Sequence, residues 1–171
     1  AMSVNNIDLY SKIYKPLLIN TMRIEGPDCY RCPYQKERDS CQAECFEHME
    51  KCLADNQEET AAVIIEPMVQ GAAGMRIYSP VYLQKLRKAC DQYDVLLIAD
   101  EIAVGYGRTG KMWAVEHAGI APDILCSSKG LTAGYLPMAL TITTNEITLK
   151  APDSFKVTIK TKTAFQPCST N

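Results

Sequence analysis

Three short apolar runs divide the middle of the chain and predict strands. The runs cover residues 61–65 (AAVII), 95–99 (VLLIA) and 124–126 (ILC). Each run is continuously apolar and stops at polar residues, which is typical of strands buried in a parallel sheet. A fourth segment, 139–143, alternates between apolar and polar residues. This alternation predicts a further strand that is partly exposed.

Between the first two runs the apolar positions change to a helical period. Ser79 and Pro80 are typical of a helix start, with serine as the N-cap and proline in the first turn. The apolar residues that follow recur three or four positions apart: Leu83, Leu86, Ala89, Cys90 and Tyr93. A strand, a helix and a strand in this order predict a βαβ unit with a right-handed crossover. We therefore expect an α/β fold with a mostly parallel sheet flanked by helices.

The first third of the chain carries weaker signals. Residues 7–18 predict a short helix or turn that Pro16 interrupts, and residues 27–40 predict a loop. A second helix is predicted from an N-cap at Ser40 to about Ala54. On that helix Cys45, Met49, Cys52 and Leu53 would share one face.

Composition narrows the class of protein. The chain has 171 residues, of which 47% are hydrophobic and 22% charged, enough for one domain with a core. A net charge of −2 gives no reason to expect nucleic acid or a membrane surface as a partner. No apolar stretch reaches the roughly 20 residues that span a bilayer. The first residues do not resemble a signal peptide, so we expect a cytoplasmic location.

Eight cysteines allow two interpretations. The spacing Cys29-x2-Cys32-x8-Cys41-x3-Cys45 is compatible with a zinc or iron–sulfur site. In a reducing compartment the residues can equally be free thiols. We predict free thiols and no metal, because Cys45 and Cys52 fall on the apolar face of the predicted helix.

Two residues that can carry chemistry directly follow predicted strands. Asp100 comes after the second run, and Lys129 comes shortly after the third. Ligands of open α/β sheets bind outside the carboxyl ends of the strands. A lysine there can form an imine with an aldehyde cofactor, and a carboxylate can hold a pyridine nitrogen protonated. From position alone, Lys129 can also be a solvated loop residue and Asp100 a cap of the next turn.

Motifs spread over several predicted elements carry a family resemblance. They are IIEP (64–67), GAAGM (71–75), LIADEI (97–102), GYGRTG (105–110), PDILC (122–126) and KGLTAG (129–134). Together they resemble the class III pyridoxal-phosphate aminotransferases over residues 1–147. The resemblance implies the large domain of a fold-type I transferase that uses pyridoxal 5'-phosphate.

The resemblance also implies a role for each site residue. Lys129 would be the catalytic lysine that links to the cofactor, and Asp100 would bind the pyridine nitrogen. Ile102 would pack on one face of the cofactor ring. Glu101 would be structural, because neighbouring side chains diverge in an extended chain. For Glu66 a positioning role and a substrate contact both remain open, and Cys126 is expected in the core.

Within the family, the residue at one position narrows the choice of substrate. Many class III members place a glutamine where this chain has Ala103, and alanine there resembles the members that act in biotin synthesis. That implies S-adenosylmethionine as amino donor and 8-amino-7-oxononanoate as acceptor, handled by a homodimer. The alternatives are another ω-aminotransferase of the acetylornithine, ornithine or 4-aminobutyrate type, or a non-catalytic fragment with a cysteine metal site.

The resemblance further implies an incomplete domain. Residues 1–149 correspond to part of the large domain, and residues 150–171 diverge from the family and are expected to be a poorly ordered tail. Family members carry further cofactor and substrate contacts beyond both ends of this stretch. We therefore expect little or no transaminase activity from the 171 residues alone.

Overall fold

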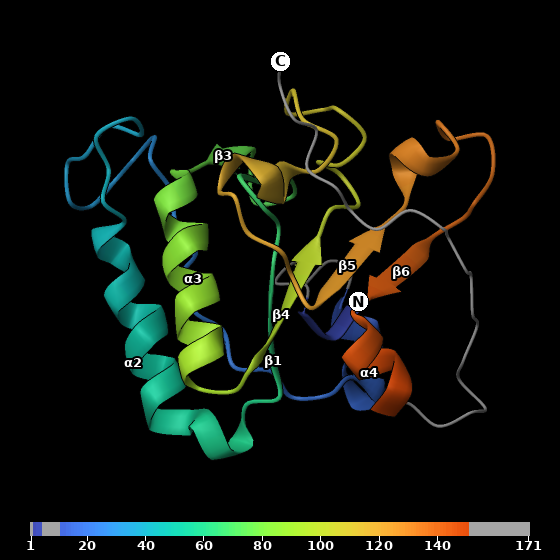
Figure 1. Cartoon of the computed structure of the whole chain (residues 1–171), viewed down its shortest axis with the longest axis horizontal. Helices are drawn as coiled ribbons and strands as arrows, with labels where there is room; N and C mark the ends of the chain where they lie inside the picture. Colours follow the sequence, from blue (N-terminus) through green and yellow to red (C-terminus); the bar gives the residue numbers. More distant parts are fainter. Residues whose placement is uncertain (1, 5–10, 151–171) are drawn as a thin grey trace.

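The computed structural model describes residues 2–4 and 11–150 (Figure 1). The strands are β1 (Ala62–Ile65), β2 (Val69–Gln70), β3 (Arg76–Ile77), β4 (Leu96–Asp100), β5 (Ile124–Ser127) and β6 (Leu140–Thr143). The α-helices are α2 (Glu47–Asn56), α3 (Pro80–Gln92) and α4 (Asn145–Lys150). Short 3-10 helices are η1 (Met2–Val4), η2 (Lys12–Leu17), η3 (Glu44–Phe46), η4 (Gln57–Glu59), η5 (Ala114–His117) and η6 (Lys129–Leu131).

Four strands form one sheet in the order β1-β4-β5-β6. Strands β1 and β5 both run parallel to β4, whereas β6 is antiparallel to β5. The predicted α/β class with a mostly parallel sheet is therefore confirmed. The register pairs Ile64 with Ile98, Ile98 with Ile124, and Asp100 with Cys126. Consequently the carboxyl ends of β4 and β5 meet at one edge of the sheet.

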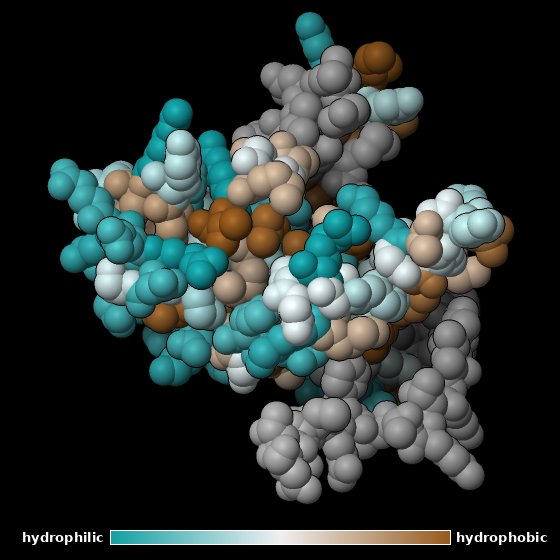
Figure 2. Space-filling model, turned by 90° about the horizontal axis from the view of Figure 1, so that it is seen from above, coloured by the Kyte–Doolittle hydropathy of each residue, from teal (hydrophilic) through white to brown (hydrophobic). Residues whose placement is uncertain are grey.

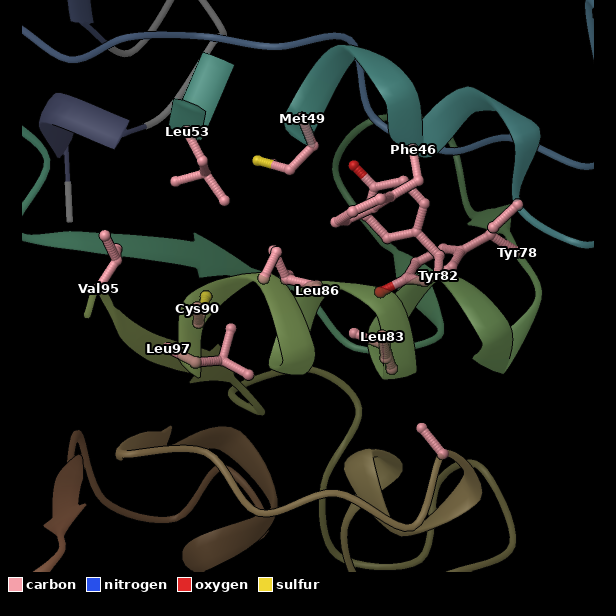
Figure 3. Close-up of a cluster of buried hydrophobic side chains, with 13 residues drawn as sticks. Phe46, Met49, Leu53, Tyr78, Tyr82, Leu83, Leu86, Cys90, Val95 and Leu97 are labelled. Atoms are coloured by element: carbon pink, nitrogen blue, oxygen red, sulfur yellow. The ribbon is translucent and has the colours of Figure 1, made fainter. Parts of the chain in front are cut away.

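Helix α3 connects β1 to β4 and begins as its sequence predicts. The Ser79 hydroxyl accepts a hydrogen bond from the Val81 N–H at 3.4 Å, and Pro80 is the first helical residue. The buried face of α3 consists of Tyr82, Leu83, Leu86, Ala89 and Cys90. These residues belong to one core cluster that also contains Met49 and Leu53 of α2 and Leu97 of β4. Figure 3 shows most of this cluster.

Aromatic rings fill the end of this core that lies near the start of α3 (Figure 3). Phe46 and Tyr82 meet edge to face with their centroids 5.2 Å apart, and Tyr78 meets Tyr82 in the same way at 5.8 Å. Tyr78 is fully buried, and its hydroxyl donates to the Glu66 carbonyl at 2.7 Å. The start of α3 is thereby tied to the end of β1.

The predicted second helix begins later than its sequence suggests. Ser40 is not its N-cap: the Ser40 hydroxyl donates to the Glu37 carbonyl, and the 3-10 turn η3 precedes α2. Ala43 stands before η3 with a φ of 53°, a left-handed conformation that no helix continues. Met49 and Leu53 are buried as predicted, but Cys52 is only half-buried.

Other elements differ because of neighbours that sequence periodicity does not reveal. Strand β1 is half-exposed rather than buried, because within this sheet it has β4 alone as a partner, and Ile64 keeps 36% of its surface. The β2–β3 hairpin that follows β1 and the helix α4 were not predicted. Pro16 lies inside η2 instead of interrupting a helix. Residues 7–10 and residues 151–171 of the predicted tail 150–171 lie outside the described residues, whereas Lys150 ends α4.

The surface at the carboxyl ends of β4 and β5 mixes hydrophilic and apolar side chains (Figure 2). Large apolar side chains exposed on the described part of the chain include Met75, Met112, Tyr135 and Leu136. Among the described residues, none of the helices has the length and apolar character that crossing a bilayer requires.

Candidate active site

Asp100 ends β4 at the edge of the sheet where ligands of α/β folds bind. Its side chain is half-buried, and its Oδ1 accepts a hydrogen bond from the Ile102 N–H at 3.1 Å. This contact fixes the chain where it leaves the strand and orients the carboxylate. Asp100 therefore caps the turn, as its position in the sequence suggests. The cap uses Oδ1, so Oδ2 remains available to a ligand.

Lys129 follows the neighbouring strand at the same edge. The ladder between β4 and β5 extends through a hydrogen bond from the Glu101 N–H to the Cys126 carbonyl at 2.9 Å. Ser127 ends β5 as a buried residue, and Lys129 opens the turn η6 with an exposed side chain. The structure thus brings the two predicted residues to the ends of adjacent parallel strands.

Ile102 and Ala103 begin the turn that follows Asp100, and both are half-buried. The Asp100 side chain holds the Ile102 backbone by the contact described above. Ile102 therefore lies beside the Asp100 carboxylate. The predicted packing of Ile102 on a cofactor ring bound by Asp100 requires this proximity. Its predicted role remains a prediction.

Tyr106 contacts the Lys129 turn, although its sequence position gave no reason to single it out. The Ser127 hydroxyl donates to the Tyr106 hydroxyl at 2.9 Å. The ring lies so close to Gly130 that a Cβ atom on Gly130 would be 2.5 Å from it. The ring also meets the Trp113 ring edge to face at 5.1 Å. The only sequence signal was the glycine directly after Lys129.

Glu101 has the structural role predicted for it. The residue is fully buried and turns away from Asp100, and its carboxylate accepts hydrogen bonds from the Ala114 and Val115 N–H groups at 3.0 and 2.9 Å. Burial raises the pKa of the Glu101 carboxyl, and the two hydrogen bonds oppose that rise. Glu101 thereby holds η5 against the loop that follows β4.

Glu66 and Cys126 also lie near this edge of the sheet. Glu66 accepts a hydrogen bond from the Gly71 N–H at 2.9 Å, which favours a positioning role over a substrate contact. Cys126 is half-buried, so its predicted place in the core is wrong, because it lies on the sheet face that carries Asp100. Burial and then the nearby Asp100 raise the pKa of the Cys126 thiol.

The sequence matches a known family over most of its length. The profile described as Aminotransferase class-III covers residues 1–158. The chain belongs to the class III aminotransferase family. The predicted resemblance is thereby confirmed.

Comparison with individual proteins shows which members of the family this chain is similar to. The chain is 45% identical over 148 residues to the adenosylmethionine-8-amino-7-oxononanoate aminotransferase of Geobacter sulfurreducens, which covers 86% of this chain and 33% of that protein. It is 42% identical to the enzyme of the same name from Staphylococcus aureus, over 86% of this chain and 32% of that protein. The chain thus spans about a third of the length of the curated relatives it matches.

Solved structures agree with this placement. The adenosylmethionine-8-amino-7-oxononanoate aminotransferase of Methanocaldococcus jannaschii superposes with a TM-score of 0.71 at 40% identity, over 86% of this chain and 32% of that chain. An amine transaminase from an uncultivated Pseudomonas species, solved in its PLP-bound form, gives a TM-score of 0.76 at 37% identity, over 85% and 33%. These similarities confirm the fold-type I assignment.

Proposed function

We propose that this chain forms part of the active site of a pyridoxal 5'-phosphate-dependent aminotransferase. The observation that carries the proposal is the position of Asp100 and Lys129 at the ends of adjacent parallel strands, in a member of the class III family. A carboxylate and an amine at one edge suit the two ends of this cofactor, its ring nitrogen and its aldehyde. The residues of the chain therefore fit the group.

Each residue then has a defined task. The bound cofactor would supply an aldehyde and an electron-accepting ring. The Lys129 amine would hold the cofactor covalently and, once displaced by substrate, carry the proton to and from the substrate Cα. Asp100 would keep the pyridine nitrogen protonated, and Ile102 would pack on one face of the ring. Tyr106 would position the Lys129 turn through Ser127 and Gly130.

A spectroscopic experiment tests the cofactor site. The purified chain is mixed with pyridoxal phosphate, and its visible absorption is compared with that of Lys129→Ala and of a control, Lys88→Ala, which removes an exposed lysine on α3. We expect a band that borohydride reduction abolishes, present in the wild type and the control and absent from Lys129→Ala. Peptide mapping that places the reduced cofactor on another lysine would refute the assignment.

The proposed substrates are S-adenosylmethionine as amino donor and 8-amino-7-oxononanoate as acceptor, giving 7,8-diaminononanoate. The names of the most similar relatives and the alanine at position 103 support this choice. The test compares S-adenosylmethionine with ornithine, acetylornithine and 4-aminobutyrate as donors, in a protein of the relatives' length that carries this chain. Faster transfer from one of the latter three would favour the ω-aminotransferase alternative.

The same family membership leads us to propose a homodimer and a cytoplasmic location. Two apolar side chains close to the Lys129 turn, Tyr135 and Leu136, are 92% and 59% exposed and would suit a subunit contact. Light scattering coupled to size exclusion checks the mass. A monomer at micromolar concentration in that longer protein would contradict the proposal.

A further inference from the structure

Four cysteines outside the candidate active site line one small cavity. They are Cys29, Cys32, Cys41 and Cys45. The cavity has a volume of about 10 Å³, and its lining also includes Pro27, Asp28, Ala43, Tyr78, Ser79 and Tyr82. A space of this size holds one water-sized particle or a single ion and excludes any organic ligand.

The four cysteines come in two close pairs on two turns. One turn carries Cys29 and Cys32, and the other carries Cys41 and Cys45, next to the left-handed residue Ala43. Both turns are fastened to the segment that begins α3: the Cys29 N–H donates to the Ile77 carbonyl at 3.2 Å, and the Ser79 hydroxyl donates to the Cys41 carbonyl at 3.3 Å. Backbone contacts to the same segment therefore bring the two pairs together.

Hydrogen-bond donors surround the sulfur atoms. The Ala43 N–H donates to the Cys41 Sγ at 3.3 Å, and the Ser79 backbone N–H hydrogen-bonds to the Cys29 sulfur. Donors of this kind stabilise a negatively charged sulfur and are the outer partners that metal-bound thiolates use.

We propose that Cys29, Cys32, Cys41 and Cys45 bind one Zn²⁺ ion as a four-thiolate structural site. The two pairs have the short spacings, two and three intervening residues, that tetrahedral zinc sites favour. The cavity supplies room for the ion, and the backbone donors supply its outer partners. This inference is independent of the proposed aminotransferase function.

Ligation requires the thiols to adjust. As their side chains lie, no group of three or more His, Cys, Asp or Glu in residues 2–4 and 11–150 could hold a metal ion, so the cavity thiols must turn before they can bind one. Cysteine has a single side-chain torsion with staggered alternatives, so its sulfur can turn about a fixed backbone. The prediction of free thiols from the sequence rested on Cys45 and Cys52 sharing an apolar face. The structure separates them, because Cys45 lines the cavity and Cys52 does not.

Metal content provides the first test. The purified chain, dialysed against zinc and then against metal-free buffer, is compared with Cys29→Ser, Cys41→Ser and the control Cys52→Ser, which changes a half-buried thiol away from the cavity. We expect one zinc per chain in the wild type and the control, and a loss of affinity of about 10-fold or more in the other two variants. Zinc retained by both cavity variants would overturn the proposal.

A second measurement on the wild type avoids variants that fail to fold. Cysteines are alkylated with and without Zn²⁺ and located by mass spectrometry. Zinc should slow modification at the four cavity cysteines and leave the rates at Cys52 and Cys126 unchanged. Co²⁺ should give the intense thiolate-to-metal absorption of a tetrahedral site. Equal protection of all cysteines, a disulfide within the cavity instead of bound zinc, or stoichiometric iron with inorganic sulfide would overturn the proposal.

Discussion

Gly130 directly follows Lys129, and its missing side chain lets the Tyr106 ring lie against the turn that carries the lysine. In Gly130→Ala the new Cβ would meet Tyr106 ring atoms at 2.5 to 2.8 Å, so the ring or the turn must move. We expect a loss of about 1–3 kcal/mol in the free energy of unfolding, measured with urea, because overpacking forces such shifts. The lysine-dependent absorption with pyridoxal phosphate should weaken as well.

The matched control for this change is Gly71→Ala, where the closest atom to the new Cβ would be Glu66 Oε2 at 3.4 Å. That is ordinary contact, so its stability should stay within about 1 kcal/mol of the wild type. If the two alanine variants unfold at the same urea concentration, Tyr106 does not constrain the Lys129 turn.

Glu101 makes a prediction about pH. Burial raises the pKa of its carboxyl above the ordinary 4.5, so the native state binds this proton more tightly than the unfolded state does. The ionised group therefore costs stability, and the cost develops as pH rises from about 4.5 through the raised native value. Relative to Glu101→Gln, which cannot ionise, the wild type should lose unfolding free energy across that window.

Urea unfolding at a series of pH values from about 4 to about 8 measures this difference. Glu50→Gln, at an exposed position on α2, is the control and should follow the wild type. A wild type that gains stability over Glu101→Gln as pH rises would mean that the hydrogen bonds from Ala114 and Val115 outweigh the burial.

At the scale of the elements, Asp123 joins α3 to the amino ends of β4 and β5. Its Oδ2 accepts hydrogen bonds from the Leu97 N–H and from Arg87 Nη1, both at 2.7 Å. Asp123→Ala should lower the free energy of unfolding by about 2–3 kcal/mol, because it removes charge-assisted hydrogen bonds to half-buried Arg87 and to the backbone of buried Leu97.

Chemical denaturation followed by circular dichroism checks this prediction. The comparison is Lys51→Ala, which breaks the exposed pair of Lys51 with Asp55 on α2 and should cost less than about 1 kcal/mol. An Asp123→Ala variant as stable as Lys51→Ala would show that α3 docks through its apolar face alone.

The elements that the sequence predicted correctly are those whose pattern reflects burial along a single strand or helix. The four sheet strands and α3 belong to this group, including the cap at Ser79. The hydrophobic pattern did not predict elements that depend on backbone conformation. Ala43 has a left-handed conformation, so α2 begins later than predicted. The strands of the β2–β3 hairpin are two residues long, too short to show a pattern. The edge position of Asp100 and Lys129 was predictable, whereas the Tyr106 contact depends on a loop path that no periodicity encodes.

At the scale of the whole molecule, the described sheet is covered unequally on its two faces. Val63, Ile65 and Leu97 face the core that α2 and α3 close. On the opposite face Ile64 and Leu96 keep 36% and 37% of their surface exposed, and Ile98 is half-buried. Asp100 lies on this second face, in register with Cys126. The candidate site therefore opens toward the less covered side of the sheet, in a chain about a third as long as its curated relatives.

Asp100→Asn separates the two tasks of Asp100. Asparagine keeps the oxygen that accepts the Ile102 N–H, so the stability of the fold should change by less than about 1 kcal/mol. It loses the charge that would hold a protonated pyridine nitrogen. Affinity for pyridoxal phosphate should therefore fall about 10- to 100-fold, the range expected for one charge-assisted hydrogen bond.

Absorbance titration with pyridoxal phosphate measures the affinity, and urea unfolding of the same samples measures the stability. Asp94→Asn is the control: it is an exposed aspartate at the other end of β4 with a φ of 53°, a conformation that asparagine also tolerates. If Asp100→Asn binds like the control, Asp100 serves the turn alone and the cofactor ring must be held by another acid. If it unfolds more easily without losing affinity, the hydrogen bond to Ile102 depends on the negative charge and the same conclusion holds. Only weaker binding by a fold of unchanged stability assigns the pyridine nitrogen to Asp100.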